Sequence, residues 1–328
     1  MHFRTTFSIP ESAFKIDHQQ KILTIGSCFS DEIGSRLMES KFNSFINPFG
    51  VIFNPVSIQN LIKRSTQKQP YTMNDVHQNG EQFFCFDVHS SFNSLYANEV
   101  LDSINATITE VHNYLKMAHI VIITLGTSWV YRFNETQSIV ANCHKVSAKS
   151  FEKILLSTEE NKAALETIIN DLKLINPSVQ IIFTVSPVRH IKDGIVENNV
   201  SKARLIDAIY QIKQKFTAVQ YFPSYELVMD DLRDYRFYKS DLIHPSQEAV
   251  NYIWEHFSTT YFTELTQAIN QKINKIKLAI NHRPFNEASE AHQTFLQKTK
   301  VQMEEIVQKY GIDFSAELVH INSKIKSC

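Results

Sequence analysis

Between residues 21 and 260, short apolar runs of strand length alternate with longer stretches of helical periodicity. The clearest runs span residues 21–25, 119–125 and 179–185, and weaker candidates lie at 42–46 and 218–222. A run that is apolar at nearly every position is typical of a strand buried on both faces. The alternation therefore predicts an α/β fold, in which helices cover both sides of a parallel sheet.

The length of 328 residues allows about two domains at ~150 residues each. The strand and helix alternation ends near residue 260, and residues 263–328 show two or three lysine-rich amphipathic helices. We therefore expect an α/β domain over residues 1–261 and a helical extension over 262–328. The extension is also a candidate surface for forming a homodimer.

Charge and composition exclude several classes of function. Lys and Arg number 33 against 34 Asp and Glu, and the net charge of -1 argues against a nucleic-acid partner. The longest apolar run is far shorter than the ~20 residues of a membrane span, and the N-terminus does not resemble a signal peptide. Four scattered cysteines fit a cytoplasmic protein. Because no metal-ligand spacing or nucleotide-binding loop occurs, we expect neither a metal nor a cofactor.

Glycine is scarce, with 7 residues in 328, or about 2% against an ordinary ~7%. Three of them, Gly26, Gly50 and Gly126, each follow a strand-like run. In open α/β sheets, ligands bind outside the carboxyl ends of the strands. The sequence therefore predicts a functional site where these three glycines converge.

Ser27 lies at this predicted edge, immediately before a helix that begins near Ser30. Free N–H groups and the dipole of a helix N-terminus favour negative charge. A hydroxyl nucleophile beside such donors fits acyl transfer, in which an oxyanion develops. Two alternatives stay open: Ser27 as a helix N-cap only, and Cys28 as the nucleophile.

The best candidate for a general base is His244, which precedes Pro245 in a predicted loop. Asp241 lies three residues earlier, where a tight bend brings its carboxylate to the imidazole. His89 and Ser90, which follow Asp87, are an alternative dyad. Further groups near strand ends are expected to line the pocket, and they are Gly26, Cys28, His89, Ser90, Gly126, His144, Arg189 and His190.

The segment Gly26-Ser27-Cys28-Phe29-Ser30 resembles the motif that names the GSCFA domain family, which is similar to the SGNH, or GDSL-like, hydrolases. Five further segments carry the same resemblance, and they begin at Asn47, Leu125, Asn142, Ser186 and Asp241. The resemblance covers roughly residues 20–260. It implies a flavodoxin-like, three-layer αβα sandwich with a five-stranded parallel sheet in the order 2-1-3-4-5.

The resemblance also implies site roles: Ser27 as nucleophile, Asp241 and His244 as its partners, and the N–H groups of Ser27 and Gly50 as oxyanion donors. One block departs from the SGNH pattern. Where Gly-x-Asn-Asp is usual, this chain has Gly126-Thr127-Ser128-Trp129. Losing one oxyanion donor costs ~10²–10³ in rate. The candidates to replace the missing asparagine are Asn54, Thr127 and Ser128.

Two functions follow as expectations. The first is a serine-dependent ester hydrolase or acyltransferase that acts on a small acyl ester, such as an O-acetylated carbohydrate. The second is a catalytically silent binding module that keeps the pocket without a complete oxyanion hole.

Overall fold

The structure is a computed structural model that describes residues 4–287 and 289–325. The outermost residues of both predicted domains, and Cys328 with them, lie outside the described residues.

Five parallel strands form the central sheet, and the predicted α/β class is confirmed. Their order across the sheet is β2-β1-β5-β9-β10, which is the expected 2-1-3-4-5 order among parallel strands. The strands are β1 (Lys21–Gly26), β2 (Asn43–Ile46), β5 (Ile120–Leu125), β9 (Gln180–Val185) and β10 (Val219–Phe222).

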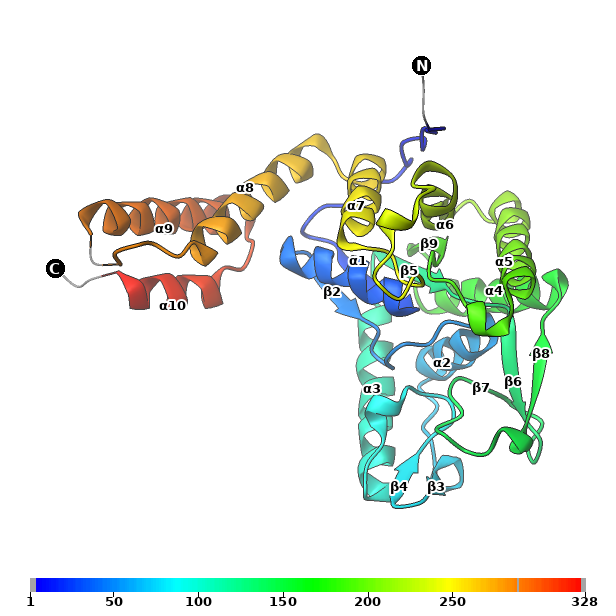
Figure 1. Cartoon of the computed structure of the whole chain (residues 1–328). Coiled ribbons are helices and arrows are strands. Elements are labelled where there is room, and N and C mark those ends of the chain that lie inside the picture. The colour runs from blue at the N-terminus through cyan, green and yellow to red at the C-terminus, as the bar shows by residue number, and fades with distance from the viewer. Residues whose placement is uncertain (1–3, 288, 326–328) are drawn as a thin grey trace.

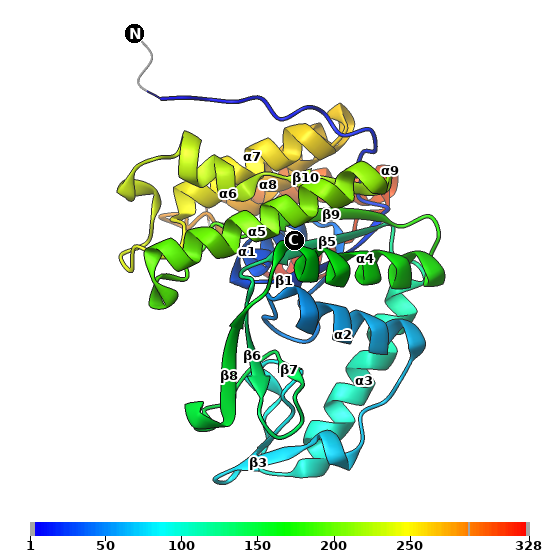
Figure 2. The same cartoon turned by 90° about the vertical axis from the view of Figure 1, so that its right-hand side faces the viewer.

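Helices cover both faces of this sheet, as Figures 1 and 2 show from two directions. Successive side chains of a strand point to opposite faces. Leu23 and Ile25 accordingly pack in the core beneath α2 to α5, whereas Ile22 packs in the core beneath α1 and α7. The helices are α1 (Cys28–Glu39), α2 (Pro55–Gln67), α3 (Ala97–Leu115), α4 (Thr158–Ile175), α5 (Ile195–Lys215), the short α6 (Ser224–Glu226) and α7 (Gln247–Tyr261).

A smaller antiparallel part lies below the sheet in both views. It contains the hairpin β3 (His77–Asn79) and β4 (Gln82–Phe84), and a three-stranded sheet of β6 (Trp129–Phe133), β7 (Ile139–Val140) and β8 (Phe151–Leu155). β8 pairs with β6 directly before α4, and α4 begins at Thr158. A capping box of Ser157 and Glu160 sets that start.

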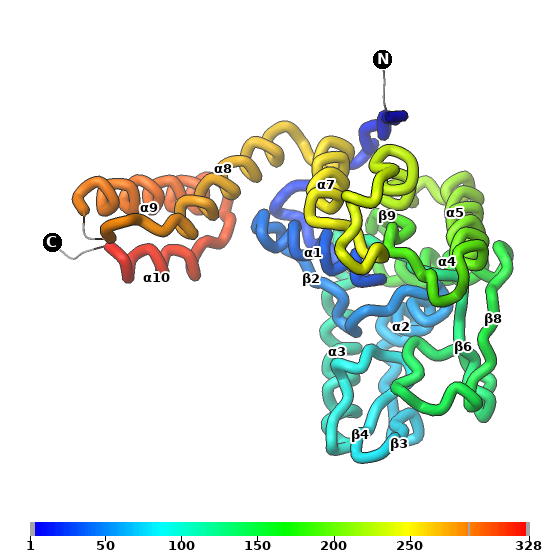
Figure 3. The backbone as a smooth tube through the Cα atoms, in the orientation of Figure 1, coloured from blue at the N-terminus to red at the C-terminus, as the bar shows by residue number. Residues whose placement is uncertain are grey.

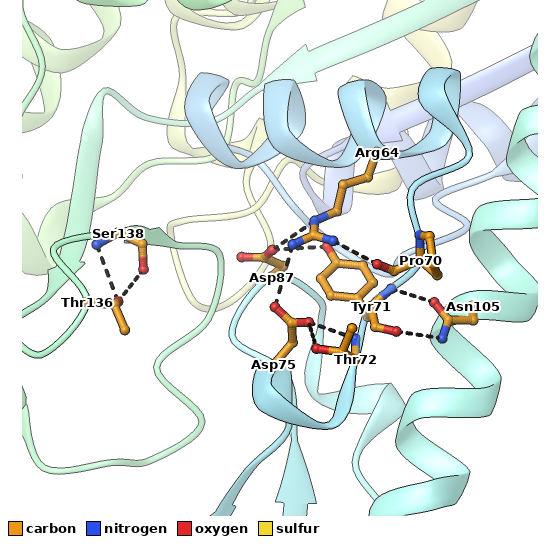
Figure 4. A network of polar contacts seen from close by, with 9 residues as sticks. All are labelled: Arg64, Pro70, Tyr71, Thr72, Asp75, Asp87, Asn105, Thr136 and Ser138. Atoms are coloured by element: carbon orange, nitrogen blue, oxygen red, sulfur yellow. Dashed lines mark hydrogen bonds and ion pairs between the residues drawn. The ribbon is translucent and has the colours of Figure 1, made fainter.

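A polar network joins the chain on both sides of the β3–β4 hairpin to α2 and α3 (Figure 4). The Arg64 guanidinium lies 4.0 Å from the centroid of the Tyr71 ring and pairs with Asp75 at 3.5 Å and Asp87 at 4.0 Å. Tyr71 Oη donates to Asp87 at 3.0 Å, and Asn105 bonds both backbone groups of Tyr71. Burial raises the pKa of Asp87. The Asp87 carboxylate is therefore part of this structural network.

The expected helical extension consists of α8 (Glu264–Asn281), α9 (Glu290–Tyr310) and α10 (Ser315–Lys324). These helices share a core of their own, which includes Ile273, Met303 and Phe314. Figures 1 and 3 show that they project to one side of the α/β body. The boundary at residue 262 and the homodimer remain predictions. Among the described helices, none is long and apolar enough to cross a membrane.

Candidate active site

Ser27 lies directly at the carboxyl end of β1, where Gly26 lets the chain pass close to β5. Gly26 has φ +153°, and a Cβ on it would lie 2.3 Å from the Thr124 carbonyl oxygen of β5. Only glycine therefore fits between the two strands. Ser27 is 2% exposed and caps α1, because its Oγ accepts the N–H of Phe29 at 3.2 Å. Within the described residues, the hydroxyl proton of Ser27 has no acceptor.

Asp241 and His244 meet in the loop before α7. His244 Nδ1 lies 2.7 Å from Asp241 Oδ2, and Asp241 Oδ1 accepts the N–H groups of His244 and Ile243 at 3.0 and 2.9 Å. These N–H groups and the imidazole lower the pKa of Asp241 to about 2, so the carboxylate is ionised at neutral pH. A carboxylate at Nδ1 holds the proton on that nitrogen and leaves Nε2 as an acceptor.

Ser27 and His244 line one cavity of about 630 Å³, although they come from opposite ends of the α/β domain. In the described part of the chain, no hydrogen bond joins Ser27 Oγ to His244. Such contacts are often long in unliganded sites and shorten when substrate binds. The same cavity is lined by Cys28, Asn54, His89, Thr127, Arg189 and His190, which were all predicted to lie at the site.

The two expected backbone donors of the oxyanion hole are both occupied. The N–H of Ser27 donates to the Thr124 carbonyl at 3.0 Å, and the N–H of Gly50 donates to the Asn47 carbonyl at 2.7 Å. Gly50 has φ +75°, and a Cβ on it would lie 2.3 Å from His89 Cβ. Position 50 therefore needs a glycine for its turn and for the close approach of His89. The prediction that the N–H groups of Ser27 and Gly50 are oxyanion donors is wrong, because both already bond backbone carbonyls.

Thr127 and Ser128, in the turn between β5 and β6, bond Ser201 of α5. Ser128 is 0% exposed and lies outside the cavity; its Oγ donates to the Ser201 carbonyl and its N–H donates to Ser201 Oγ. The Thr127 hydroxyl bonds Ser201 Oγ at 2.9 Å and accepts the N–H of Trp129. The Ser128 hydroxyl is not available to replace the missing asparagine, because its proton goes to Ser201. Thr127 lines the cavity and keeps its proton for a ligand when Ser201 Oγ is the donor between them.

Asn54 retains a donor whichever way the bond between Thr127 and Ser201 runs. It caps α2, where its Oδ1 accepts the N–H of Ser57 at 2.8 Å. One of its amide protons goes to Ser57 Oγ at 2.9 Å. Because an amide nitrogen carries two protons, the second remains for a ligand in the cavity.

Two family models match this chain. The model of the GSCFA family matches residues 21–257, which is well over half of the chain. The chain belongs to the GSCFA family. The model of the GSCFA domain protein C-terminal domain matches residues 273–327, within the helical extension. The resemblance drawn from the segment at Gly26 to Ser30 is thereby confirmed.

More distant comparisons add little. One solved structure to which the chain is similar is a carbohydrate esterase family 3 protein from Talaromyces cellulolyticus. It is 10% identical, the match covers 77% of this chain and 99% of that chain, and the TM-score is 0.35. The search of curated proteins found no match.

Cys28 lines the cavity of this GSCFA domain beside Ser27, and the structure disfavours it as the nucleophile. The side chain is half-buried, and this burial, followed by the charge of Asp31, raises the pKa of its thiol. The reactive form of cysteine is the thiolate. At neutral pH the Cys28 side chain is therefore a neutral thiol.

The alternative dyad of His89 and Ser90 does not form. Ser90 does not line the cavity, and His89 Nδ1 accepts the N–H of Ser91 at 3.2 Å. A neutral imidazole that accepts at Nδ1 carries its proton on Nε2. His89 Nδ1 is thus engaged by Ser91, and Asp87 belongs to the network around Arg64.

Three other residues that were predicted to line the pocket, Gly26, Gly126 and His144, do not line the cavity. His144 is stacked on Phe84 with ring centroids 4.5 Å apart, and its Nε2 bonds the Val88 carbonyl. Burial lowers the pKa of His144 to about 4, and the ring does not line the cavity. Gly126 also lies outside the cavity, and Phe53 lines it instead. The missing Cβ of Gly126 makes room for the Phe53 ring.

The loop after β9 holds the His244 turn in place. The N–H of Arg189 donates to the Ile243 carbonyl at 3.2 Å, and its Nη1 donates to the Leu242 carbonyl at 3.3 Å. His190 follows in the cavity wall. Burial, and then the charge of Lys202, lowers the pKa of His190 to about 4, so this ring is neutral at neutral pH.

Lys202, a lysine on α5 that was not predicted to be buried, is only 1% exposed. Its Nζ donates to the Ser186 carbonyl at 2.7 Å and lies 5.8 Å from the Tyr225 ring centroid. Burial lowers its pKa to about 7. Helical periodicity contained the signal, because Asn198 and Leu205 place residue 202 on the buried face.

We expect Lys202→Met to stabilise the protein more at pH 6 than at pH 9. Lysine in the unfolded chain has a pKa of ~10.4. Between pH 7 and 10 the unfolded chain therefore binds more protons at this lysine than the folded chain does, and the stability of the wild type rises with pH. Below pH 7 the full cost of burying the charge applies, and methionine removes it. The gain at pH 6 is about 1–4 kcal/mol, less ~1 for the lost hydrogen bond.

Urea unfolding at both pH values measures this difference. Lys213→Met, at an exposed position on the same helix, is the control and should change stability little at either pH. A Lys202→Met variant that loses more stability at pH 6 than at pH 9 would show that the buried ammonium is net favourable.

Proposed function

We propose that this GSCFA protein is a serine-dependent ester hydrolase or acyltransferase that acts on small acyl esters, such as O-acetylated carbohydrates. One observation carries the proposal. A serine hydroxyl with an unassigned proton and an imidazole whose Nδ1 is held by a carboxylate line the same cavity. A serine needs a base to be a nucleophile, and in the proposal His244, from another wall of the same cavity, takes this role.

In the proposed reaction, His244 Nε2 takes the proton of Ser27 Oγ while Oγ attacks the ester carbonyl carbon. The carbonyl oxygen becomes an oxyanion, and the ionised Asp241 stabilises the imidazolium. Collapse of the intermediate breaks the bond to the alcohol oxygen, which receives the proton from His244. The acyl group remains on Ser27. Water, or a second alcohol, then attacks the acyl carbon with His244 again as base, and Ser27 is restored.

Oxyanion stabilisation is assigned to donors that the fold does not use. The N–H of Cys28, in the first turn of α1, has no preceding helical carbonyl to bond. It lies at the positive end of the helix dipole, next to Ser27. The second amide proton of Asn54 comes from another wall of the same cavity. These two groups replace the occupied N–H groups of Ser27 and Gly50 in the proposal.

A covalent probe tests the proposal directly. We expect a fluorophosphonate to add one adduct, found on Ser27 by peptide mass spectrometry, and p-nitrophenyl acetate to be hydrolysed. Addition of an alcohol acceptor distinguishes transfer from hydrolysis through formation of the new ester. An adduct on Cys28 would contradict the assigned nucleophile. Absence of both adduct and turnover would favour the silent binding module, which the occupied N–H groups also favour.

A further inference from the structure

A second cavity, of about 430 Å³, lies beside the candidate active site and shares Arg189 and Ile191 with it. Its walls come from the start of α5, from a π-helical turn at Leu227–Asp231 and from residues 233–238. We propose that this cavity is a subsite for an uncharged saccharide. On the proposed function, on which this part rests, it holds the sugar that carries the ester while the acyl group lies at Ser27.

Aromatic rings give the cavity flat apolar surfaces. Tyr225, Tyr235 and Tyr238 all line it. Tyr235 is 65% exposed, and its ring centroid lies 6.0 Å from that of Tyr238. A tyrosine ring packs its apolar face against C–H groups and keeps a polar hydroxyl at its edge. A pyranose offers such a C–H face, ringed by hydroxyl groups.

Polar groups without partners supply the complementary hydrogen bonds. In the described residues, the Asp230 carboxylate, the Arg233 guanidinium and the Asn199 amide nitrogen have no hydrogen-bond or ion-pair partner. Carboxylate, guanidinium and amide groups pair with neighbouring hydroxyls as acceptors or donors. They line the same cavity as the tyrosines.

The charge of the lining distinguishes a neutral ligand from an anionic one. Two arginines, Arg189 and Arg233, and two aspartates, Asp230 and Asp234, line the cavity, and Asp234 also pairs with Arg236 at 2.8 Å. The carboxylates in this lining repel a phosphate or sulfate group. An uncharged polyol uses the donors and acceptors of both signs.

The backbone around the two cavities is unusual. A π-helical turn is rare and is frequent at functional sites, and this one brings Val228, Met229 and Asp230 to the second cavity. Leu242 has φ +58°, which is strained for a bulky residue, and its carbonyl accepts from Arg189. Arg189 thus joins the second cavity to the turn that carries His244. A sugar seated beyond Arg189 can present an ester to the first cavity.

Binding to the Ser27→Ala variant tests the subsite without turnover. The probes are the neutral disaccharides xylobiose, cellobiose and chitobiose, with glucose 6-phosphate as the anionic arm, observed by saturation-transfer NMR and calorimetry. We expect at least one neutral disaccharide to bind, and Tyr235→Ala to weaken it about tenfold or more. Tyr210→Ala is the matched control, since Tyr210 is 64% exposed but lies on α5 outside both cavities.

Kinetics then separate this inference from the proposed function. With Tyr235→Ala, we expect the ratio of kcat/KM for acetylated xylobiose to that for p-nitrophenyl acetate to fall about tenfold, whereas Tyr210→Ala leaves it unchanged. Disaccharide binding that depends on Tyr235, without any ester turnover, would support the subsite and contradict the esterase. No disaccharide binding, binding indifferent to Tyr235, or preference for the phosphorylated sugar would overturn the subsite.

Discussion

Replacing Ser27 with alanine is expected to lower kcat/KM for p-nitrophenyl acetate by about 10⁴-fold or more, because the proposed covalent intermediate cannot form. Ser27 Oγ also accepts the N–H of Phe29, and losing this N-cap costs ~1 kcal/mol of stability. The fold should therefore survive with a slightly lower Tm. Initial rates across substrate concentrations, with thermal unfolding in parallel, measure both effects.

The matched control for Ser27→Ala is Ser157→Ala. Ser157 caps α4, where its Oγ accepts the N–H of Glu160 at 3.1 Å, and it does not line the cavity. The same cap is lost, so stability should fall by a similar amount while activity is retained. Cys28→Ala should also stay active. Activity that survives Ser27→Ala and disappears in Cys28→Ala would move the nucleophile to the thiol.

The features that depend on local pattern could be predicted from the sequence. The apolar runs predicted the strands correctly because helices cover both faces of this sheet. Ile22 and Leu23 therefore both lie in a core, one on each face. The spacing of Asp241 and His244 predicted their contact, since a carboxylate that accepts the N–H groups of its own loop also reaches the imidazole. The strand order followed from the family resemblance.

The features that depend on distant partners could not be predicted. Gly26 and Gly126 occupy strand ends as expected, but whether the N–H groups of Ser27 and Gly126 are free depends on Thr124 and Phe53, which only the folded chain brings near. The Ser128 hydroxyl is consumed by Ser201, on a helix far along the chain. Sequence pattern therefore located the edge of the site more reliably than it identified the hydrogen-bond donors within it.

Asp241→Asn is expected to lower kcat by about 10³–10⁴-fold while the loop keeps its shape. The asparagine Oδ1 can still accept the N–H groups of Ile243 and His244, which Asp241 Oδ1 bonds now. Its amide nitrogen then faces His244 Nδ1, to which Oδ2 is bonded at 2.7 Å. An amide donates where the carboxylate accepted, so the proton moves to Nε2 and His244 cannot take the proton of Ser27.

Asp313→Asn is the matched control, because Asp313 also accepts a backbone N–H two residues on, from Ser315 at 2.8 Å, but lies in the helical extension. It should retain full activity. The Asp241 variant should also keep its reaction with the fluorophosphonate measurable but slowed, since the probe needs the same base. The low pKa of Asp241, about 2, means that wild type keeps this carboxylate ionised across any practical assay range. Loss of activity in Asp241→Asn therefore reports the lost acceptor at Nδ1, and an unchanged kcat would mean that His244 does not act as the base.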